Sequence, residues 1–157
     1  MPEAMFEGGC TCGRVRYRMV GSPMIVHACH CRWCQRETGG AFAENALIET
    51  DRVTLLQGDV DRVDTPTQSG RGQVIVRCAA CRVALWSHYS GMGEKAAFVR
   101  VGSLDEPDLL PPDIHIFTAS KQPWVVLPPG APAFAEFYDI PSQWPSASLE
   151  RMAALRR

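Results

Sequence analysis

Apolar and polar residues alternate over short distances along most of the chain, which is the period-two pattern of β-strands with one buried face. In the stretch Gly13–Val20, three arginines alternate with apolar side chains. The polar, turn-rich stretch Gly58–Gly72 predicts a hairpin or a loop excursion. Seven further segments also have strand-like composition, and they are Met24–Ala28, Ala43–Glu49, Val53–Leu56, Gln73–Arg77, Val83–Tyr89, Ala97–Val101 and Ile114–Thr118. The pattern therefore predicts a mainly β fold.

Helix signals are few. Trp33–Thr38 is long enough for one or two helical turns, and the glycine pair that begins at Gly39 would end them. Near the C-terminus, Ser146 or Ser148 is placed to cap a short helix through Leu149–Leu155. Prolines are frequent after residue 106, and they break the last third of the chain into extended segments and turns.

Length and composition exclude several classes of protein. With 157 residues, 46% of them hydrophobic and 21% charged, the chain fits one ordinary globular domain. The net charge of −1 argues against a nucleic-acid binder that depends on phosphate contacts. We find no apolar run long enough to span a membrane and no apolar core of a secretory signal near the acidic N-terminus, so we expect a cytoplasmic protein with reduced thiols.

Cysteine is the residue type that carries candidate chemistry, with seven copies in three groups. A Cys-X-Cys pair on an extended segment, or a Cys-X-X-Cys pair on a turn, offers two sulfurs to one metal ion and so forms half of a tetrahedral site. The pairs at the start and in the middle of the chain together predict a closed, structural zinc site with four thiolates, and these are Cys10, Cys12, Cys78 and Cys81.

The remaining group is Cys29, Cys31 and Cys34. Three protein ligands and one open position are the usual arrangement of a catalytic zinc, so this group predicts a second zinc site. Other interpretations stay open: a vacant thiol cluster, a redox-active group, or a second structural site completed by His27 or His30.

Several segments resemble the glutathione-dependent formaldehyde-activating enzyme family, which also includes centromere protein V. The resemblance covers about residues 7 to 138. It rests on Gly9–Tyr17, on Cys29–Cys34 with the following glycine pair, on Cys78–Cys81, on Val101–Asp105, and on His115–Thr118 with Lys121–Trp124. One departure is Arg82, where the family usually has a glycine, a residue suited to a positive φ.

The resemblance implies a β-tent of packed antiparallel sheets built around the structural zinc site, with a second zinc on the Cys-X-Cys-X-X-Cys segment. It implies a zinc domain over residues 1–138, with residues 139–157 as a C-terminal extension. It also implies carbon–sulfur lyase chemistry, in which glutathione and formaldehyde form S-(hydroxymethyl)glutathione reversibly. Members with the same zinc ligands need not share a substrate, so a non-catalytic zinc-stabilised binding module and a thiol redox sensor remain alternatives.

The resemblance to a thiol-using lyase makes a proton acceptor and carboxylate-binding groups worth identifying. His30, between two predicted zinc ligands, and His88 are candidate bases, because histidine titrates near neutrality; second-shell or solvated roles are the alternative. Arg32, Arg36 and Lys121 are candidates to pair with the carboxylates of glutathione, although such residues are more often only solvated. We therefore predict Cys29, Cys31, Cys34 and His30 as the catalytic residues.

Overall fold

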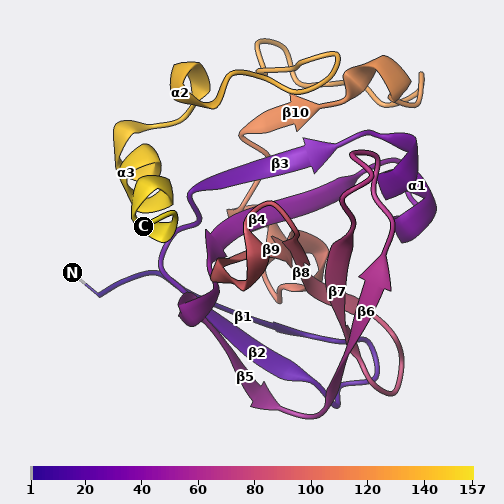
Figure 1. Ribbon diagram of the computed structural model, residues 1–157. Helices are drawn as coiled ribbons and strands as arrows, with labels where there is room; N and C mark the ends of the chain where they lie inside the picture. The colour runs from indigo at the N-terminus through magenta and orange to yellow at the C-terminus, as the bar shows by residue number, and fades with distance from the viewer. Residues whose placement is uncertain (1) are drawn as a thin grey trace.

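The structure is a computed structural model that describes residues 2–157, and two β-sheets dominate it (Figure 1). The smaller sheet is antiparallel and has the order β1 (Met5–Gly9), β2 (Arg16–Val20), β5 (Val53–Gln57). The larger sheet runs β10 (Ile114–Ile116), β3 (Ile25–Cys29), β4 (Ala43–Glu49), β9 (Ala96–Arg100), β8 (Ala84–Tyr89), β7 (Gln73–Cys78), β6 (Val60–Thr65). The predicted mainly β fold of packed sheets is confirmed.

Strand pairing departs from the simple antiparallel pattern at one edge of the larger sheet. There, β10 pairs with β3 in parallel, so the sheet is mixed. Two strands also lie outside the predicted segments. One is β1, and the other is β6, which lies inside Gly58–Gly72, where a hairpin or a loop was predicted, and forms the first arm of a β6–β7 hairpin.

One face of the larger sheet packs on the smaller sheet and forms the main core. The alternation in β2 sets this contact, because Tyr17 and Met19 point inward and are fully buried. Arg16, before Tyr17, and Arg18, between the two, point outward and pair with Asp105 and Glu7 respectively. The opposite face of the larger sheet carries a second apolar cluster, to which the C-terminal segment contributes.

The helices are short and lie at the edges of the sheets (Figure 1). Helix α1 (Arg32–Thr38) ends at Gly39, which adopts the left-handed conformation with φ 71°, as predicted. In the C-terminal segment, α2 (Ile140–Gln143) precedes α3 (Ser146–Leu155). Single-turn 3₁₀ helices in the part of the chain that the structure describes are Thr50–Arg52, Gly93–Lys95, Val101–Ser103, Pro107–Leu109 and Thr118–Ser120.

The predicted capping of the C-terminal helix is wrong. Pro145 occupies the N-cap position of α3, and no side chain caps this helix end. Ser148 instead donates its hydroxyl hydrogen to the carbonyl of Met24, at 2.7 Å. This bond ties α3 to the residue just before β3, where Ser148 stabilises tertiary packing. Within residues 2–157, no helix has the length and apolarity needed to cross a bilayer.

Candidate metal centres and the adjoining cavity

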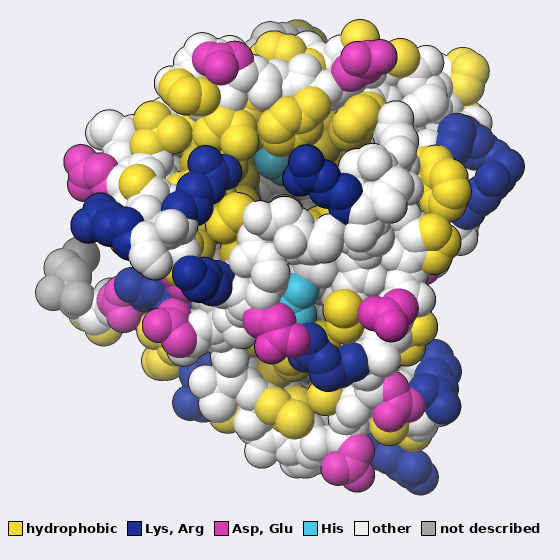
Figure 2. All heavy atoms as spheres, viewed as in Figure 1, with side chains coloured by type: hydrophobic (Ala, Val, Ile, Leu, Met, Phe, Trp, Pro, Cys, Tyr) yellow, Lys and Arg dark blue, Asp and Glu magenta, His cyan; other side chains and the backbone are white. Residues whose placement is uncertain are grey.

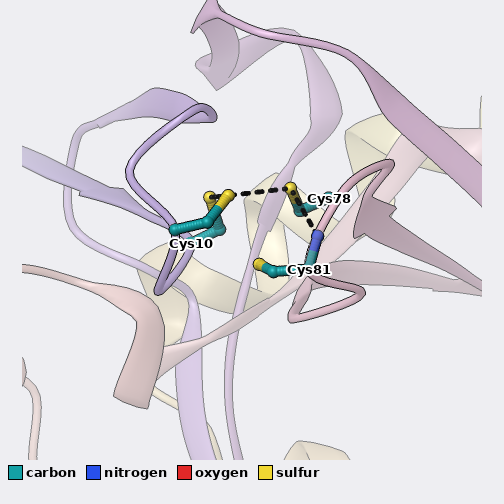
Figure 3. Close-up of side chains that lie close together, drawn as sticks. Cys10, Cys78 and Cys81 are labelled. Carbon is teal, nitrogen blue, oxygen red and sulfur yellow. Dashed lines mark hydrogen bonds between the residues drawn. The ribbon is translucent and has the colours of Figure 1, made fainter.

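Four cysteines come together where the two sheets meet at one end. Cys10 and Cys12 lie in the loop after β1, Cys78 ends β7, and Cys81 lies in the turn between β7 and β8 (Figure 3). All four sulfurs lie within 4.8 Å of one another. The Sγ atoms of Cys10 and Cys12 are 3.4 Å apart, and those of Cys12 and Cys78 are 3.7 Å apart. We call this group cluster 1.

Backbone turns hold the sulfurs of cluster 1 in place. The N–H of Val15 donates to the Sγ of Cys10 at 3.2 Å, and the N–H of Cys81 donates to the Sγ of Cys78 at 3.4 Å. Burial opposes ionisation of Cys10, but the bond from Val15 and those from neighbouring sulfurs outweigh it and lower the pKa of Cys10 to about 6. The N–H of Val15 therefore favours the thiolate of Cys10, the form that binds metal.

The turn after Cys81 carries the departure noted in the sequence. Arg82 has φ 67°, in the left-handed region where glycine is favoured. Its side chain pairs with Asp61, and its carbonyl accepts a hydrogen bond from Arg77. The turn therefore keeps the backbone shape that a glycine would adopt, at the cost of strain at a residue with a Cβ.

The sulfur positions of cluster 1 fit zinc. Four sulfurs at the Zn–S distance of about 2.3 Å in a tetrahedron lie about 3.8 Å from one another. The measured separations of 3.4 and 3.7 Å are close to this value. Four soft sulfur donors with backbone N–H groups directed at them are a donor set that suits a structural zinc.

The other three cysteines form cluster 2 on one short segment. Cys29 ends β3, Cys31 is the N-cap residue of α1, and Cys34 lies in the first turn of that helix. Their sulfurs lie within 4.8 Å of one another, with Cys29 and Cys31 buried and Cys34 half-buried. Hydrogen bonds from the thiols of Cys29 and Cys34 lower the pKa of Cys31. Three converging sulfurs fit a metal ion that keeps one position open.

Gln35 fixes the backbone on which cluster 2 is built. This buried side chain donates to the carbonyls of His30 and Ser120, at 2.8 and 2.9 Å. Its Oε1 accepts hydrogen bonds from Arg32 and from Gln122. The segment with Cys31 is thereby held between α1 and the loop that follows β10.

A cavity of about 480 Å³ adjoins cluster 2, and all three of its cysteines are among the residues that line it. The cavity lies over the face of the larger sheet that the smaller sheet does not cover. Most of the lining surface is apolar. The lining residues come from β3, β4, β9, the end of β10, α1 and the C-terminal segment, and also from the polar loop between β6 and β7 and the turn after β8. Figure 2 shows a hollow framed by hydrophobic side chains, with a histidine at its depth and basic side chains beside its opening. The lining includes His27.

Arg100 is a buried cation on the same side of the sheet, and the sequence analysis did not identify it. It is 8% exposed, and it donates to Asn45, which lines the cavity, and to Ser87. Among residues 2–157, no carboxylate forms an ion pair with Arg100, and its Nε has no hydrogen-bond partner. Burial raises the pKa of Tyr89, the charges of cluster 2 add to this rise, and Arg100 opposes it. Arg100 and cluster 2 therefore act on a common neighbour.

The only sequence signal for Arg100 was a lone basic residue at the end of an apolar strand. Two arginines that line the cavity, Arg71 and Arg156, were not identified from the sequence either. Arg71 lies in a polar loop and Arg156 just beyond α3. No local pattern separates them from solvated surface residues.

His30 is fully buried and pairs with His115, with 3.0 Å between the Nε2 of His30 and the Nδ1 of His115. Burial, with smaller contributions from His115 and Lys121, lowers the pKa of His30 to about 4. Its Nδ1 has no hydrogen-bond partner within the described part of the chain. His30 does not belong to the lining of the cavity at cluster 2. The other candidate base, His88, is buried and its Nδ1 lies 2.8 Å from the carbonyl of Ala96.

The predicted carboxylate-binding residues also lie outside the cavity lining. The guanidinium of Arg32 donates to Gln35, and the ammonium of Lys121 donates to the carbonyl of Val125 at 2.7 Å. Arg36 is exposed in the last turn of α1. The structure therefore brings together the cysteines predicted for each cluster and places the predicted basic residues elsewhere.

Comparison with known proteins gives three findings. The family of glutathione-dependent formaldehyde-activating enzymes matches residues 5–120, which include all seven cysteines. A Halomonas elongata protein, assigned provisionally as a glutathione-dependent formaldehyde-activating enzyme, is 25% identical over 132 residues, covering 77% of this chain and 80% of that protein. The crystal structure of a Rhodobacter sphaeroides protein has a TM-score of 0.45 and 16% identity, covering 63% of this chain and 87% of that one.

Proposed function

The chain belongs to the glutathione-dependent formaldehyde-activating enzyme family, and from this premise we propose that it is a zinc-dependent carbon–sulfur lyase. The proposed reaction is the reversible joining of a small thiol such as glutathione to an aldehyde, with an S-(hydroxyalkyl) adduct as the product. The observation that carries the proposal is the position of cluster 2. Its three sulfurs converge within 4.8 Å and also line a cavity of about 480 Å³.

The two clusters have different roles in this proposal. Cluster 1 holds a structural zinc with four thiolates, and its ligands come from both sheets. Cys29, Cys31 and Cys34 would hold a second zinc at cluster 2, beside the cavity that they line. A metal with four protein ligands has no place for a substrate, whereas one with three keeps such a place.

A zinc ion held by three thiolates supplies a soft site at which an incoming thiol is stabilised as its thiolate. Groups of the protein position the reacting sulfur, exclude water and balance charge. Cys29, Cys31 and Cys34 fix the position of the reacting sulfur at the cavity wall. The apolar lining excludes water, which makes a bare thiolate more reactive toward a carbonyl. Arg100 offsets the net charge of −1 that three thiolates and one zinc ion place in a poorly solvated region.

In the chemical step, the sulfur lone pair forms the C–S bond to the aldehyde carbon, and the carbonyl electron pair moves to oxygen. The oxygen takes up a proton equivalent to the one that the thiol released. The reverse reaction breaks the C–S bond and returns both reactants. The catalytic role predicted for His30 stays a prediction, and a His30→Gln variant with an unchanged pH profile of activity would remove it.

The proposal is tested by titrating glutathione into the zinc-loaded protein. Because the thiol enters as thiolate, a proton is released, and the calorimetric heat depends on the ionisation enthalpy of the buffer. S-methylglutathione carries no thiol proton and should bind more weakly, with a heat independent of the buffer. In Cys34→Ser, the two ligands should bind alike. Equal binding of the two ligands to the wild-type protein would overturn thiol exchange at cluster 2 and favour a binding module instead.

A further inference from the structure

The cavity beside cluster 2 is much larger and more apolar than formaldehyde requires. A water molecule takes up about 30 Å³ in the liquid, and formaldehyde, with two heavy atoms, is similar in size. The cavity measures about 480 Å³, which lies within the range of sites for whole organic ligands. Glutathione is polar along its length, so it does not match an apolar wall either. The lining calls for a ligand with an apolar group.

The apolar wall is built by parts of the chain that are distant in sequence. Leu47 and Phe98 contribute from neighbouring strands, while Trp144 and Met152 come from the C-terminal segment. Phe117 also lines the cavity and has φ 55°, a left-handed conformation that is strained for a bulky residue. Such strain persists only where the surrounding structure enforces it. The wall is therefore a specific construction, and residues after the family match at 5–120 complete it.

The opening of the cavity carries positive charge. Arg71, from the loop between β6 and β7, and Arg156, just beyond α3, are exposed and belong to the lining. Among the residues described, neither forms an ion pair with a carboxylate. In Figure 2, basic side chains stand beside the hollow in this view. Two unpaired guanidinium groups at a mouth are suited to carboxylates of a ligand whose apolar part lies deeper.

We infer that the aldehyde handled at cluster 2 carries an aromatic or branched apolar group, and that the thiol partner carries carboxylates which bind Arg71 and Arg156. This inference rests on the proposed lyase function and names its substrate class. The sulfur of the thiol adds to the carbonyl carbon, the carbonyl oxygen takes the proton, and the apolar substituent fills the space between Phe98 and Trp144. No oxidant or reductant takes part in this addition or in its reversal.

Binding of stable thioethers tests the inference without any chemical step. S-benzylglutathione and S-methylglutathione share the same carboxylates and differ in the apolar group, and neither can form a thiolate. By calorimetry on the zinc-loaded full chain, the benzyl compound should bind at least about tenfold more tightly, because a phenyl ring leaves water. Equal affinities would overturn the inference.

Variants locate the two parts of the ligand. Phe137, which lines the cavity and is 47% exposed, is a tolerant position, so Phe137→Ala should reduce the preference for the benzyl compound several-fold. Met152→Trp, which fills the cavity, should remove that preference. Trp124 lies outside the lining and is 72% exposed, so Trp124→Ala is the matched control and should change nothing.

A second pair of variants tests the positive charge at the opening of the cavity. Arg156→Gln should weaken both thioethers by about the same factor, several-fold at low salt, because both carry the same carboxylates. Arg157 is adjacent in sequence and absent from the lining, so Arg157→Gln should bind both compounds as the wild type does. An unchanged affinity in Arg156→Gln would remove the carboxylate part of the inference.

Adduct formation separates failure of this inference from failure of the lyase proposal. Exchange NMR would follow glutathione with formaldehyde and glutathione with phenylacetaldehyde, each with and without protein. Faster exchange for phenylacetaldehyde alone, or for both with phenylacetaldehyde ahead, supports the inference. Faster exchange for formaldehyde alone keeps the lyase and overturns the substrate class. Tight binding of the benzyl thioether without exchange of either aldehyde overturns the lyase and, with it, the aldehyde assignment, leaving only an apolar ligand pocket.

Discussion

Cluster 1 and cluster 2 are made of the same ligand type and differ in where their ligands come from and what surrounds them. In cluster 1, the sulfurs of Cys12 and Cys78 meet across 66 residues of chain and join a loop of the small sheet to the larger sheet. In cluster 2, three cysteines within six residues converge beside an apolar cavity. The first arrangement links distant parts of the fold, and the second places sulfur next to space for a ligand.

In the proposed roles, ligand count and surroundings, more than ligand chemistry, distinguish a structural site from a reactive one. Cluster 1 is complete with four sulfurs and lies where the sheets meet. Cluster 2 is one ligand short, and Arg100, a buried cation with no acidic partner in the described chain, acts with it on Tyr89. The two clusters should therefore respond differently to the same kind of mutation.

The largest effect is expected from Cys78→Ser. Cys78 is 1% exposed and contributes to both cluster 1 and the main core. Structural zinc binding is worth about 10 kcal/mol or more, which is comparable to the whole stability of a domain. The variant should be insoluble or lack a cooperative transition, as measured by circular dichroism during heating. Cooperative unfolding near the wild-type temperature would refute the structural role of cluster 1.

Cys31→Ser should give the opposite result, a protein that still folds. Serine is a good N-cap residue, so α1 can still begin at Arg32 after the substitution. The fold and the metal of cluster 1 should remain, and metal analysis should fall from two zinc ions per chain to one. The difference in binding between glutathione and S-methylglutathione should also disappear. If Cys31→Ser melts as Cys78→Ser does, both clusters are structural.

Arg100→Met should affect cluster 2 and leave cluster 1 unchanged. Loss of a nearby positive charge raises the pKa of a thiol that enters the cluster, typically by about one unit or more. The pH midpoint of proton release on glutathione binding should therefore move up by about one unit. Arg100→Lys keeps the charge and should move it less, and Arg62→Met, at an exposed ion pair, is the control. A wild-type midpoint in Arg100→Met would exclude Arg100 as the counter-charge.

The stability of the protein should also depend on pH through Glu44, which belongs to neither cluster. Burial raises the pKa of Glu44 to about 7, whereas its ordinary value is near 4.5. The unfolded chain therefore loses this proton at lower pH than the folded chain does, so stability falls as pH rises from about 4.5 to 7. Glu44 is only half-buried and solvent screens its charge, so Glu44→Gln should add about 1 kcal/mol at pH 8, well below the full value of the shift, and nothing at pH 4, as measured by urea unfolding. An equal gain at both pH values would show that the effect is not ionisation.

The smallest expected effect concerns the turn of cluster 1. Arg82→Gly should relieve a non-glycine residue at φ 67° and raise the free energy of unfolding by about 0.5 kcal/mol, after the entropy cost of glycine. Arg82→Ala keeps the Cβ and should give no gain, which separates backbone strain from loss of the pair with Asp61. The stabilities of the two variants and the wild type are compared by their denaturant midpoints, with all three proteins loaded with zinc. A gain in both variants would place the effect in the side chain.

The sequence was informative wherever a short pattern carries the physical cause. Alternation predicted the buried face of β2, and the cysteine spacings predicted which sulfurs converge. The glycine after α1 predicted the end of the helix, and the residue usual at position 82 predicted its positive φ. Each of these rests on residues that are close in sequence or on ligand pairs with known geometry.

Features that depend on tertiary packing escaped prediction. The parallel pairing of β10 with β3 needs a crossover connection, and no local sequence pattern predicts it. The hydrogen bond from Ser148 to Met24 joins residues 124 positions apart in sequence. A residue predicted to cap α3 therefore binds the segment before β3 instead. The two arginines that line the cavity, Arg71 and Arg156, lie 85 residues apart in sequence and reach one cavity only in the fold. The division at residue 138 stays a prediction.

The 66-residue separation of Cys12 and Cys78 also sets an order in time. While the chain is being synthesised, all of cluster 2 is available once residue 34 has emerged, whereas cluster 1 must wait until residue 81. Closing the longer loop also costs about 2 kcal/mol more than closing the five-residue interval of cluster 2. If both clusters bind metal as proposed, an unfolded or nascent chain is therefore expected to bind its first metal ion at cluster 2. Under the proposed roles, capture of metal at cluster 1 would coincide with docking of the two sheets.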